Sequence, residues 1–185
     1  DPFLVIEDLI KISSPPKNEN VIFIWPEGIL PGIFQDQIKQ YKEVFKKSLN
    51  ENHLLILGID GKFKKDSKFD YFNTFSVFDH DLNLINSYNK INLVPFGEFL
   101  PFEKILEGIG MKTITNYYQS YSKGESRDII EINQGNFSLK ILPLICYEII
   151  YSGRIFKDNN FNYIINISED GWFGNSIGPH QHFVH

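Results

Sequence analysis

The sequence holds one cysteine, Cys146, which ends an apolar run and stands two positions before a carboxylate, Glu148. A thiol is only a few per cent ionised at neutral pH, so a nucleophilic cysteine needs a base within hydrogen-bond reach or a nearby positive charge. A free cysteine in an apolar run is more often simply a small buried residue. On residue type alone, both interpretations of Cys146 are open.

Two further side chains with suitable chemistry each follow a strand-like segment. Glu27 comes just after residues 21–25, and Lys90 comes directly after residues 82–89. Groups at neighbouring strand ends of an open sheet meet in one crevice. We therefore expect Glu27 and Lys90 to meet Cys146, with Glu27 as the base and Lys90 as the positive charge.

Such a trio suits acyl transfer. The carbonyl oxygen of the substrate becomes an anion during attack, and a buried ammonium together with the backbone N–H after the nucleophile stabilises it. Lys90 and the amide of Tyr147 fit these two roles. Taken singly, Glu27 is equally compatible with a loop carboxylate, and Lys90 with a solvated hairpin end. The hypothesis of a site depends on the residues acting together.

The elements that must position these residues follow from hydrophobic patterns. Residues 21–25 and 53–59 are short apolar runs typical of buried strands. Residues 35–49 place apolar side chains three and four positions apart, which predicts a surface helix between the two strands. The order strand, helix, strand predicts that the two strands pair in parallel. The basic group KFKK at 62–65 is expected to be a solvated loop.

Two hairpins are predicted further along the chain. Residues 71–79 and 82–89 are rich in β-branched and aromatic side chains around a short turn. Residues 127–132 and 137–145 flank Gly135, which can take the positive φ of a tight turn. The last of these strands runs directly into Cys146.

Three further elements complete the prediction. Residues 101–110 and 147–160 have helical features, and residues 161–167 have the apolar pattern of a buried strand. The sum is a mixed α/β fold, with strands covered by helices.

Composition narrows the class of protein. The 185 residues are 42% hydrophobic with a formal net charge of −5, so the chain can bury one substantial core. A nucleic-acid partner is not expected, because phosphate binding needs a concentrated basic face. No apolar segment reaches the roughly 18 to 20 residues that cross a bilayer, and the chain as written is expected to be soluble.

The end of the sequence contains three histidines, His180, His182 and His185. No cysteine or ordered carboxylate spacing accompanies them, as a zinc site would require. We expect a structured loop here, and neither a metal nor a cofactor.

Four blocks of sequence resemble, in the same order, the motifs of the nitrilase superfamily of carbon-nitrogen hydrolases. These are WPEG with Glu27, YNKINLVPFGEFLPF with Lys90, ICYEII with Cys146, and DGWFGNSIGPHQHF. The second and fourth blocks favour one branch of that superfamily, the bacterial apolipoprotein N-acyltransferases. Four ordered blocks are far more specific than any single motif, and the resemblance covers roughly residues 20 to 185.

The resemblance implies a role for each matching residue. Glu27 would be the general base, Lys90 the transition-state stabiliser and Cys146 the nucleophile. Supporting roles are implied for two more acidic residues and for the residue after the nucleophile, which are Glu98, Glu148 and Tyr147. One departure stands in the fourth block, where the family commonly has Asn-Asp and this chain has Glu169 beside Asp170. The added charge is expected to alter the packing of that loop.

The resemblance also implies a fold and a reaction. The fold is a four-layer α-β-β-α sandwich, and residues 1–185 would be a nitrilase-like domain truncated at both ends. The implied enzyme takes an acyl chain from a membrane phospholipid as a thioester and passes it to the amine of a diacylglyceryl-cysteine on an apolipoprotein. It would lie in the bacterial inner membrane with this domain facing the periplasm. The aromatic segments 96–102 and 117–121 are candidates for a membrane-facing loop.

Two alternatives use the same sequence features. The first is a soluble carbon-nitrogen hydrolase, an amidase or nitrilase, with the same trio and water as the final acceptor. The second is an inactive truncated fragment that keeps the motif residues but does not assemble the site.

Overall fold

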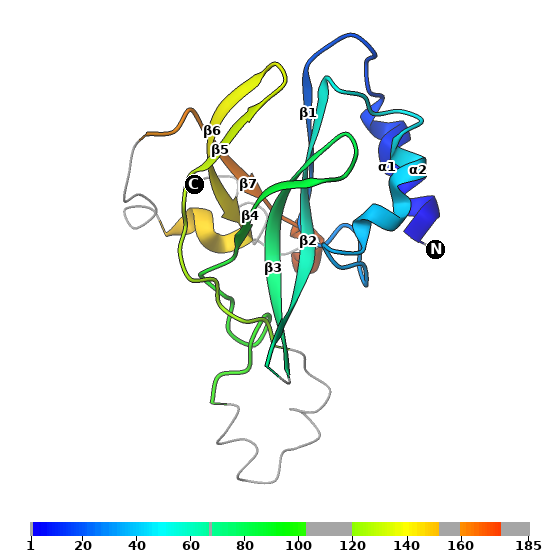
Figure 1. Ribbon diagram of the computed structural model, residues 1–185. Helices are drawn as coiled ribbons and strands as arrows, with labels where there is room; N and C mark the ends of the chain where they lie inside the picture. The colour runs from blue at the N-terminus through cyan, green and yellow to red at the C-terminus, as the bar shows by residue number, and fades with distance from the viewer. Residues whose placement is uncertain (1, 67, 103–119, 152–159, 175–185) are drawn as a thin grey trace.

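The computed structural model describes residues 2–66, 68–102, 120–151 and 160–174. Helices α1 and α2 lie on one side of a four-stranded sheet, β1 to β4, and a three-stranded sheet, β5 to β7, lies on its other side (Figure 1). This arrangement of helices over two facing sheets agrees with the predicted α/β sandwich.

Helix α1, Pro2–Ser13, was not among the predicted elements. Pro2 stands at its first position, where the missing N–H costs nothing. Ile6 and Ile10, four residues apart, are its buried side chains. The helix ends before Pro15, which disfavours helical backbone at the residue before it. These signals can be read from the sequence, but the sequence analysis assigned no helix or strand before residue 21.

Strand β1, Val21–Trp25, leads into a shorter helical segment than the predicted 35–49. The segment is a 3-10 helix, η1, Ile38–Tyr41, continued by one turn of α-helix, α2, Lys42–Phe45. The backbone N–H of Gln35 donates to Asp60, so the first residues of the predicted helix are tied to a strand instead.

The four-stranded sheet has the order β1-β2-β3-β4. Strand β2, His53–Lys65, pairs parallel with β1, as predicted, and antiparallel with β3, Lys68–Asp79. Strand β4, Leu84–Asn89, pairs antiparallel with β3. The prediction of a loop at 62–65 is wrong. These residues continue β2, because their backbone pairs with β3. Their side chains point alternately to the two faces of the sheet, as in any strand.

The second sheet has the order β5-β6-β7. Strands β5, Ile130–Gln134, and β6, Phe137–Ile145, form the predicted hairpin around Gly135, whose φ is +57°. Strand β7, Tyr163–Ile167, pairs parallel with β6. Two short 3-10 helices follow the strands of this sheet: η2, Cys146–Ile150, after β6, and η3, Asp170–Phe173, after β7.

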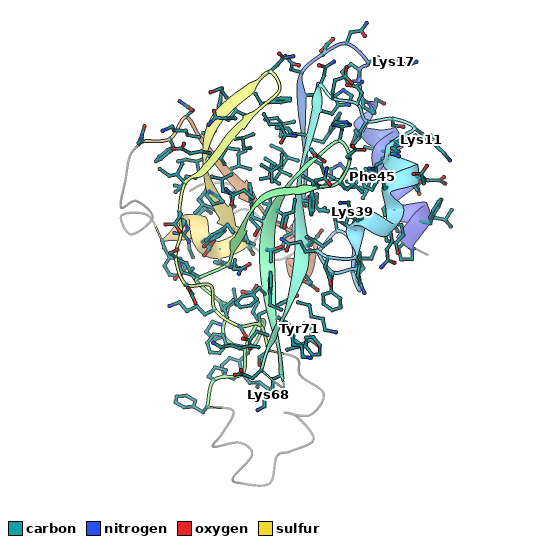
Figure 2. The ribbon with its side chains drawn as sticks, in the orientation of Figure 1. Lys11, Lys17, Lys39, Phe45, Lys68 and Tyr71 are labelled. Carbon is teal, nitrogen blue, oxygen red and sulfur yellow. The ribbon has the colours of Figure 1, made fainter. Side chains whose placement is uncertain are left out.

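Strand β2 supplies side chains to both cores, as expected for a strand buried on two faces. Leu55 and Leu57 pack with the helices, where Phe45 of α2 lies against the sheet (Figure 2). Leu54 and Ile56 point the other way, into the apolar core between the two sheets. The alternation along β2 therefore fixes which side of the sheet carries the helices.

Several predicted elements fall wholly or partly outside the described residues. The predicted helix at 101–110 lies there from residue 103 on. The predicted helix at 147–160 overlaps residues 152–159, and its described part contains most of η2. The three histidines near the end also lie outside. Within the described ranges, no helix combines the length and apolarity that a membrane span needs.

Candidate active site

The loop after β1 crosses β2 to reach the centre of the sheet. It lies directly on Gly58 of β2, where an added Cβ would stand 2.5 Å from the Cα atom of Glu27. Only glycine permits so close an approach of two backbones. Gly58 therefore lets Glu27 approach the end of β4, which is separated from β1 by two strands.

Lys90, the first residue after β4, meets two carboxylates. Its Nζ lies 3.3 Å from Oε1 of Glu27 and 2.9 Å from Oε1 of Glu98. The lysine side chain is 1% exposed, and the two carboxylate side chains are 12% and 11% exposed. An ammonium has three N–H donors, so one beyond these two contacts can serve a substrate oxygen.

Asn73 of β3 bridges the same two carboxylates, and the sequence analysis did not predict this residue. Its Nδ2 donates to Oε1 of Glu27 at 2.5 Å and to Oε1 of Glu98 at 2.8 Å. Its backbone carbonyl also accepts from the N–H of Lys90 at 2.9 Å. Asn73 thus fixes the base candidate and the lysine relative to one strand.

Cys146 follows β6 with a backbone φ of +55°, in the left-handed region. A non-glycine residue there carries strain of about 1 to 3 kcal/mol, which the surrounding structure must hold in place. The turn begins η2 directly at the cysteine and redirects the chain after Ile145. The strained turn therefore sets the direction of the thiol.

The thiol of Cys146 interacts with both predicted partners, through a hydrogen bond with Glu27 and through the charge of Lys90. Burial raises its pKa to about 12, helped by the negative charge of Glu27 and by the hydrogen bond to that carboxylate. The charge of Lys90 and a hydrogen bond with Ser168 act in the opposite direction. Cys146 is therefore a protonated thiol in the folded chain, and it needs a base to become a nucleophile.

The ammonium of Lys90 keeps its charge despite burial. Desolvation alone lowers its pKa, but the carboxylates of Glu27 and Glu98 outweigh this effect, and the pKa is raised overall. A buried cation held by two carboxylates is a preorganised partner for a developing oxyanion.

Glu148 is completely buried, at 0% exposure. Its Oε1 accepts from the backbone N–H groups of Ile91 and Asn92, which follow Lys90, at 3.0 Å and 3.1 Å. Its Oε2 accepts from the N–H of Ile145 at 3.0 Å. The carboxylate does more than cap η2, because it joins the lysine loop to the cysteine turn.

The remaining predicted residues lie beside this group. Tyr147, the second residue of η2, packs its side chain against the core between the sheets. Glu169 accepts a hydrogen bond from the N–H of Gly171 at 2.7 Å and caps η3. The added carboxylate of this chain thus has a local structural partner in the loop after β7.

A cavity of about 570 Å³ adjoins these segments. It is bordered by the residues after Lys90, by the residue after Glu98 and by the residue after η2. Its lining residues are Ile91, Asn92, Leu93, Phe99, Tyr121, Lys123 and Tyr151. The position of Tyr121 is fixed by a hydrogen bond of 2.7 Å from its hydroxyl to Asp60.

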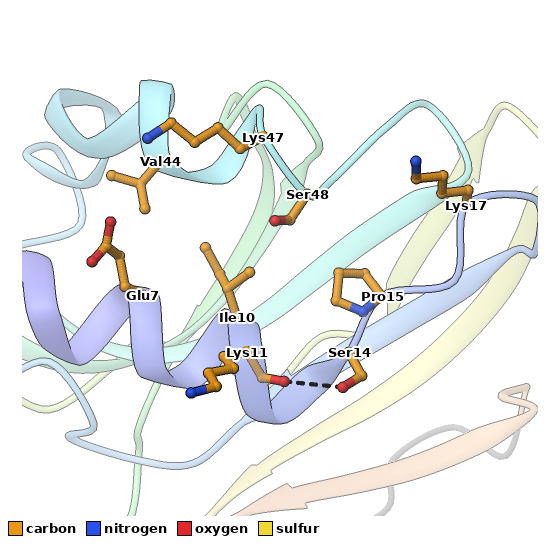
Figure 3. A pocket seen from close by; sticks show the side chains of 9 residues that line it. All are labelled: Glu7, Ile10, Lys11, Ser14, Pro15, Lys17, Val44, Lys47 and Ser48. Atoms are coloured by element: carbon orange, nitrogen blue, oxygen red, sulfur yellow. Dashed lines mark hydrogen bonds between the residues drawn. The ribbon is translucent and has the colours of Figure 1, made fainter.

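A second cavity, of about 550 Å³, lies between α1 and α2 on the opposite side of the four-stranded sheet (Figure 3). Lys11, Lys17 and Lys47 line it together with Glu7. It contains no nucleophile paired with a base, so we do not assign it to the chemistry. Among the described residues, no group of three or more His, Cys, Asp or Glu side chains gathers to hold a metal ion.

The arrangement brings together a thiol, a carboxylate and an ammonium. Acyl transfer through a thioester requires these three kinds of group: a nucleophile, an acceptor for its proton and a positive charge for the carbonyl oxygen.

Curated proteins with similar sequences include apolipoprotein N-acyltransferases. The chain is 34% identical over 186 residues to an apolipoprotein N-acyltransferase of Rhizobium leguminosarum bv. trifolii (strain WSM2304), covering 97% of this chain and 34% of that protein. It is 33% identical over 167 residues to the apolipoprotein N-acyltransferase of Caulobacter vibrioides (strain ATCC 19089 / CIP 103742 / CB 15), covering 87% of this chain and 31% of that protein. The chain thus spans about a third of the length of these curated relatives.

Solved structures show a similar fold at low sequence identity. A glutamine-dependent NAD+ synthetase from Acinetobacter baumannii matches 98% of this chain and 31% of its own, with a TM-score of 0.61 and 16% identity. A mutant amidase of the nitrilase superfamily from Nesterenkonia AN1 matches 91% of this chain and 60% of its own, with a TM-score of 0.55 and 13% identity. The family model for carbon-nitrogen hydrolases matches residues 6–185, and the chain belongs to this family.

Proposed function

We propose that this chain is the catalytic part of an apolipoprotein N-acyltransferase that uses Cys146 as nucleophile, Glu27 as general base and Lys90 as oxyanion stabiliser. The observation that carries the proposal is the meeting of these three side chains beside the aromatic-lined cavity of about 570 Å³. The names of the relatives over nearly the whole chain support the choice of acyl transfer within the family.

The first half-reaction forms a thioester. Glu27 takes the thiol proton as Sγ of Cys146 attacks an ester carbonyl carbon of a phospholipid. The oxyanion is stabilised by Lys90 and by the backbone N–H of Tyr147. The bond between the acyl carbon and the glycerol oxygen then breaks, and the proton on Glu27 passes to that oxygen to release a lysophospholipid.

The second half-reaction transfers the acyl chain. The neutral α-amine of a diacylglyceryl-cysteine attacks the thioester carbon, and Glu27 takes a proton from the nitrogen. The bond from carbon to sulfur breaks, and the proton returns to Sγ. Glu98 and Glu148 hold Lys90 and its loop in both halves, so the same groups serve twice, as a double displacement requires.

Substrate and location follow from the same proposal. An acyl chain is apolar, and the cavity beside Lys90 offers Leu93, Phe99 and Tyr151 to contact it. Phe96 and Phe102 are 72% and 75% exposed on the loop next to Glu98, which suits contact with a lipid surface. The enzyme would act at the bacterial inner membrane, with this domain on the periplasmic side.

The acceptor distinguishes this proposal from the amidase or nitrilase alternative. The protein is given phospholipid vesicles with and without a diacylglyceryl-cysteine lipopeptide, and the products are identified by mass spectrometry. The proposal predicts an N-acylated lipopeptide and a lysophospholipid, both lost in Cys146→Ala. Release of free fatty acid alone, with an unmodified lipopeptide, would instead identify a hydrolase that uses water as its acceptor.

A further inference from the structure

Two buried side chains contact Glu148: Arg127, which lies outside the four motif blocks, and Tyr88, which is the first residue of the second block. The Nη2 atom of Arg127 lies 2.7 Å from Oε1 of Glu148, and the two side chains are 5% and 0% exposed. The hydroxyl of Tyr88 donates to the same oxygen at 2.7 Å. That hydroxyl accepts from Nε and Nη2 of Arg127 at 3.2 Å and 3.0 Å.

Arg127 and Tyr88 come from segments that lie against the end of β4. Tyr88 belongs to β4, two residues before Lys90. Arg127 precedes β5, and in its segment the N–H of Gly124 donates to the carbonyl of Lys90 at 2.9 Å. A Cβ on Gly124 would collide with the carbonyl of Asn89, so this approach is tight. The segment that carries Arg127 to Glu148 is thus held in place by a backbone hydrogen bond to Lys90.

The charge of Glu148 matters because its oxygens organise two loops. They accept from the amides that follow Lys90 and from the amide that precedes Cys146. Hydrogen bonds to an ionised acceptor are roughly twice as strong as those between neutral groups. Displacement of the Glu148 carboxylate would therefore loosen the lysine loop and the strained cysteine turn together.

A completely buried carboxylate needs a counter-charge to remain ionised. The groups that face Glu148 are the Tyr88 hydroxyl from β4, the amides of the lysine loop, and the Ile145 amide beside the thiol of Cys146. Within the described part of the chain, Arg127 is the cation that forms an ion pair with Glu148, while Lys90 is paired with Glu27 and Glu98.

We propose that Arg127 and Tyr88 are positioning residues of the Cys146 site: they hold the carboxylate of Glu148 in place, and that carboxylate holds the lysine loop and the cysteine turn. The inference rests on the proposed function only in taking Cys146 as the nucleophile.

The test measures the rate constant for alkylation of Cys146 by iodoacetamide in the full 185-residue chain. In Arg127→Met, Glu148 loses its ion-pair partner, and the lysine loop and the cysteine turn lose their common anchor. Iodoacetamide reacts with the thiolate, and burial is the main cause that holds the thiol of Cys146 protonated. We therefore expect alkylation about tenfold faster than in the wild type, because a loosened turn exposes the thiol.

Two matched variants separate charge from structure. Arg127→Lys keeps a positive charge beside Glu148 and is expected to react within about threefold of the wild type. Glu131→Gln breaks the exposed ion pair between Glu131 and Lys140, whose side chains are 53% and 35% exposed, and is expected to leave the rate constant unchanged.

If Arg127→Met does not unfold cooperatively, Tyr88→Phe provides the same test. It removes one donor to Glu148 and leaves the ion pair with Arg127, so we expect alkylation about threefold faster than in the wild type. A rate constant equal to or below that of the wild type in the folded variants, or equal increases in Arg127→Lys and Arg127→Met, would overturn the inference. Because alkylation needs no acyl donor, this outcome is independent of whether acyl transfer is observed.

Discussion

At the scale of single residues, the site depends on a thiol that does not ionise by itself. The pKa of Cys146 is raised to about 12, mainly by burial and also by the charge of Glu27, while the charge of Lys90 acts in the opposite direction. A thiolate formed in advance is therefore not the reactive species. The base must act during the attack, which makes the carboxylate of Glu27 the group to test first.

In Glu27→Gln, two measurements should move in opposite directions. Removal of the negative charge lowers the pKa of Cys146, which a titration of thiolate absorbance reports. Formation of the acyl-enzyme should nevertheless slow by roughly 10² or more, because no general base accepts the proton. Glu131→Gln, at an exposed site, is the matched control. An acylation rate equal to that of the wild type would remove Glu27 from the role of base.

In Lys90→Met, the site loses its oxyanion partner and keeps a side chain of similar length. We expect a loss of transition-state stabilisation of about 3 kcal/mol in kcat/KM for acyl-enzyme formation. Lys140→Met, at a side chain that is 35% exposed, is the matched control. If Lys90→Met forms acyl-enzyme as fast as the control, Lys90 has a structural role only.

The sequence predicted Glu27, Lys90, Glu98 and Cys146 because each stands in a recognisable motif. It did not predict Asn73, which lies within a strand and has no local signal. Its two contacts join residues 46 and 25 positions away, so they depend on the register of the sheet and on the path of the β1 loop. Long-range contacts of this kind cannot be derived from spacing along the chain.

At the scale of elements, apolar runs predicted the strands well because each buried strand needs a continuous or alternating apolar face. The charged end of β2 was missed for a related reason. Lys62, Lys64 and Lys65 have no apolar pattern, and backbone pairing with β3 decides their conformation. The helix predicted at 35–49 is longer than the observed helical segment, because the backbone N–H of Gln35 donates to the carbonyl of Asp60 in β2.

Gly58→Ala tests how the elements deliver Glu27 to the site. The new Cβ would meet the backbone of Pro26 and Glu27, which must shift. We expect a decrease of about 1 to 3 kcal/mol in the free energy of unfolding, and slower acyl-enzyme formation. At Gly97, by contrast, a Cβ meets its nearest atom at 3.5 Å, so Gly97→Ala should leave the free energy of unfolding unchanged. Wild-type activity and stability in Gly58→Ala would contradict this path for the loop.

At the scale of the whole molecule, the account places the lipid-facing surface beside the cavity next to Lys90. The double variant Phe96→Ser/Phe102→Ser should weaken binding of the chain to phospholipid vesicles by about tenfold for each residue, since each ring would leave the lipid interface. Ile12→Ser, at a residue 79% exposed on α1, is the control and should bind as the wild type does. Unchanged vesicle binding in the double variant would remove this loop from the membrane contact.

The central claim is that Cys146 carries the acyl chain between donor and acceptor. Its most direct test is intact-protein and peptide mass spectrometry of the cooperatively folded chain after brief incubation with phospholipid vesicles and acid quench. The account predicts one acyl adduct, on Cys146, that hydroxylamine removes and that is missing in Cys146→Ala. An adduct on another residue, or no adduct on a folded chain that binds the vesicles, would contradict it.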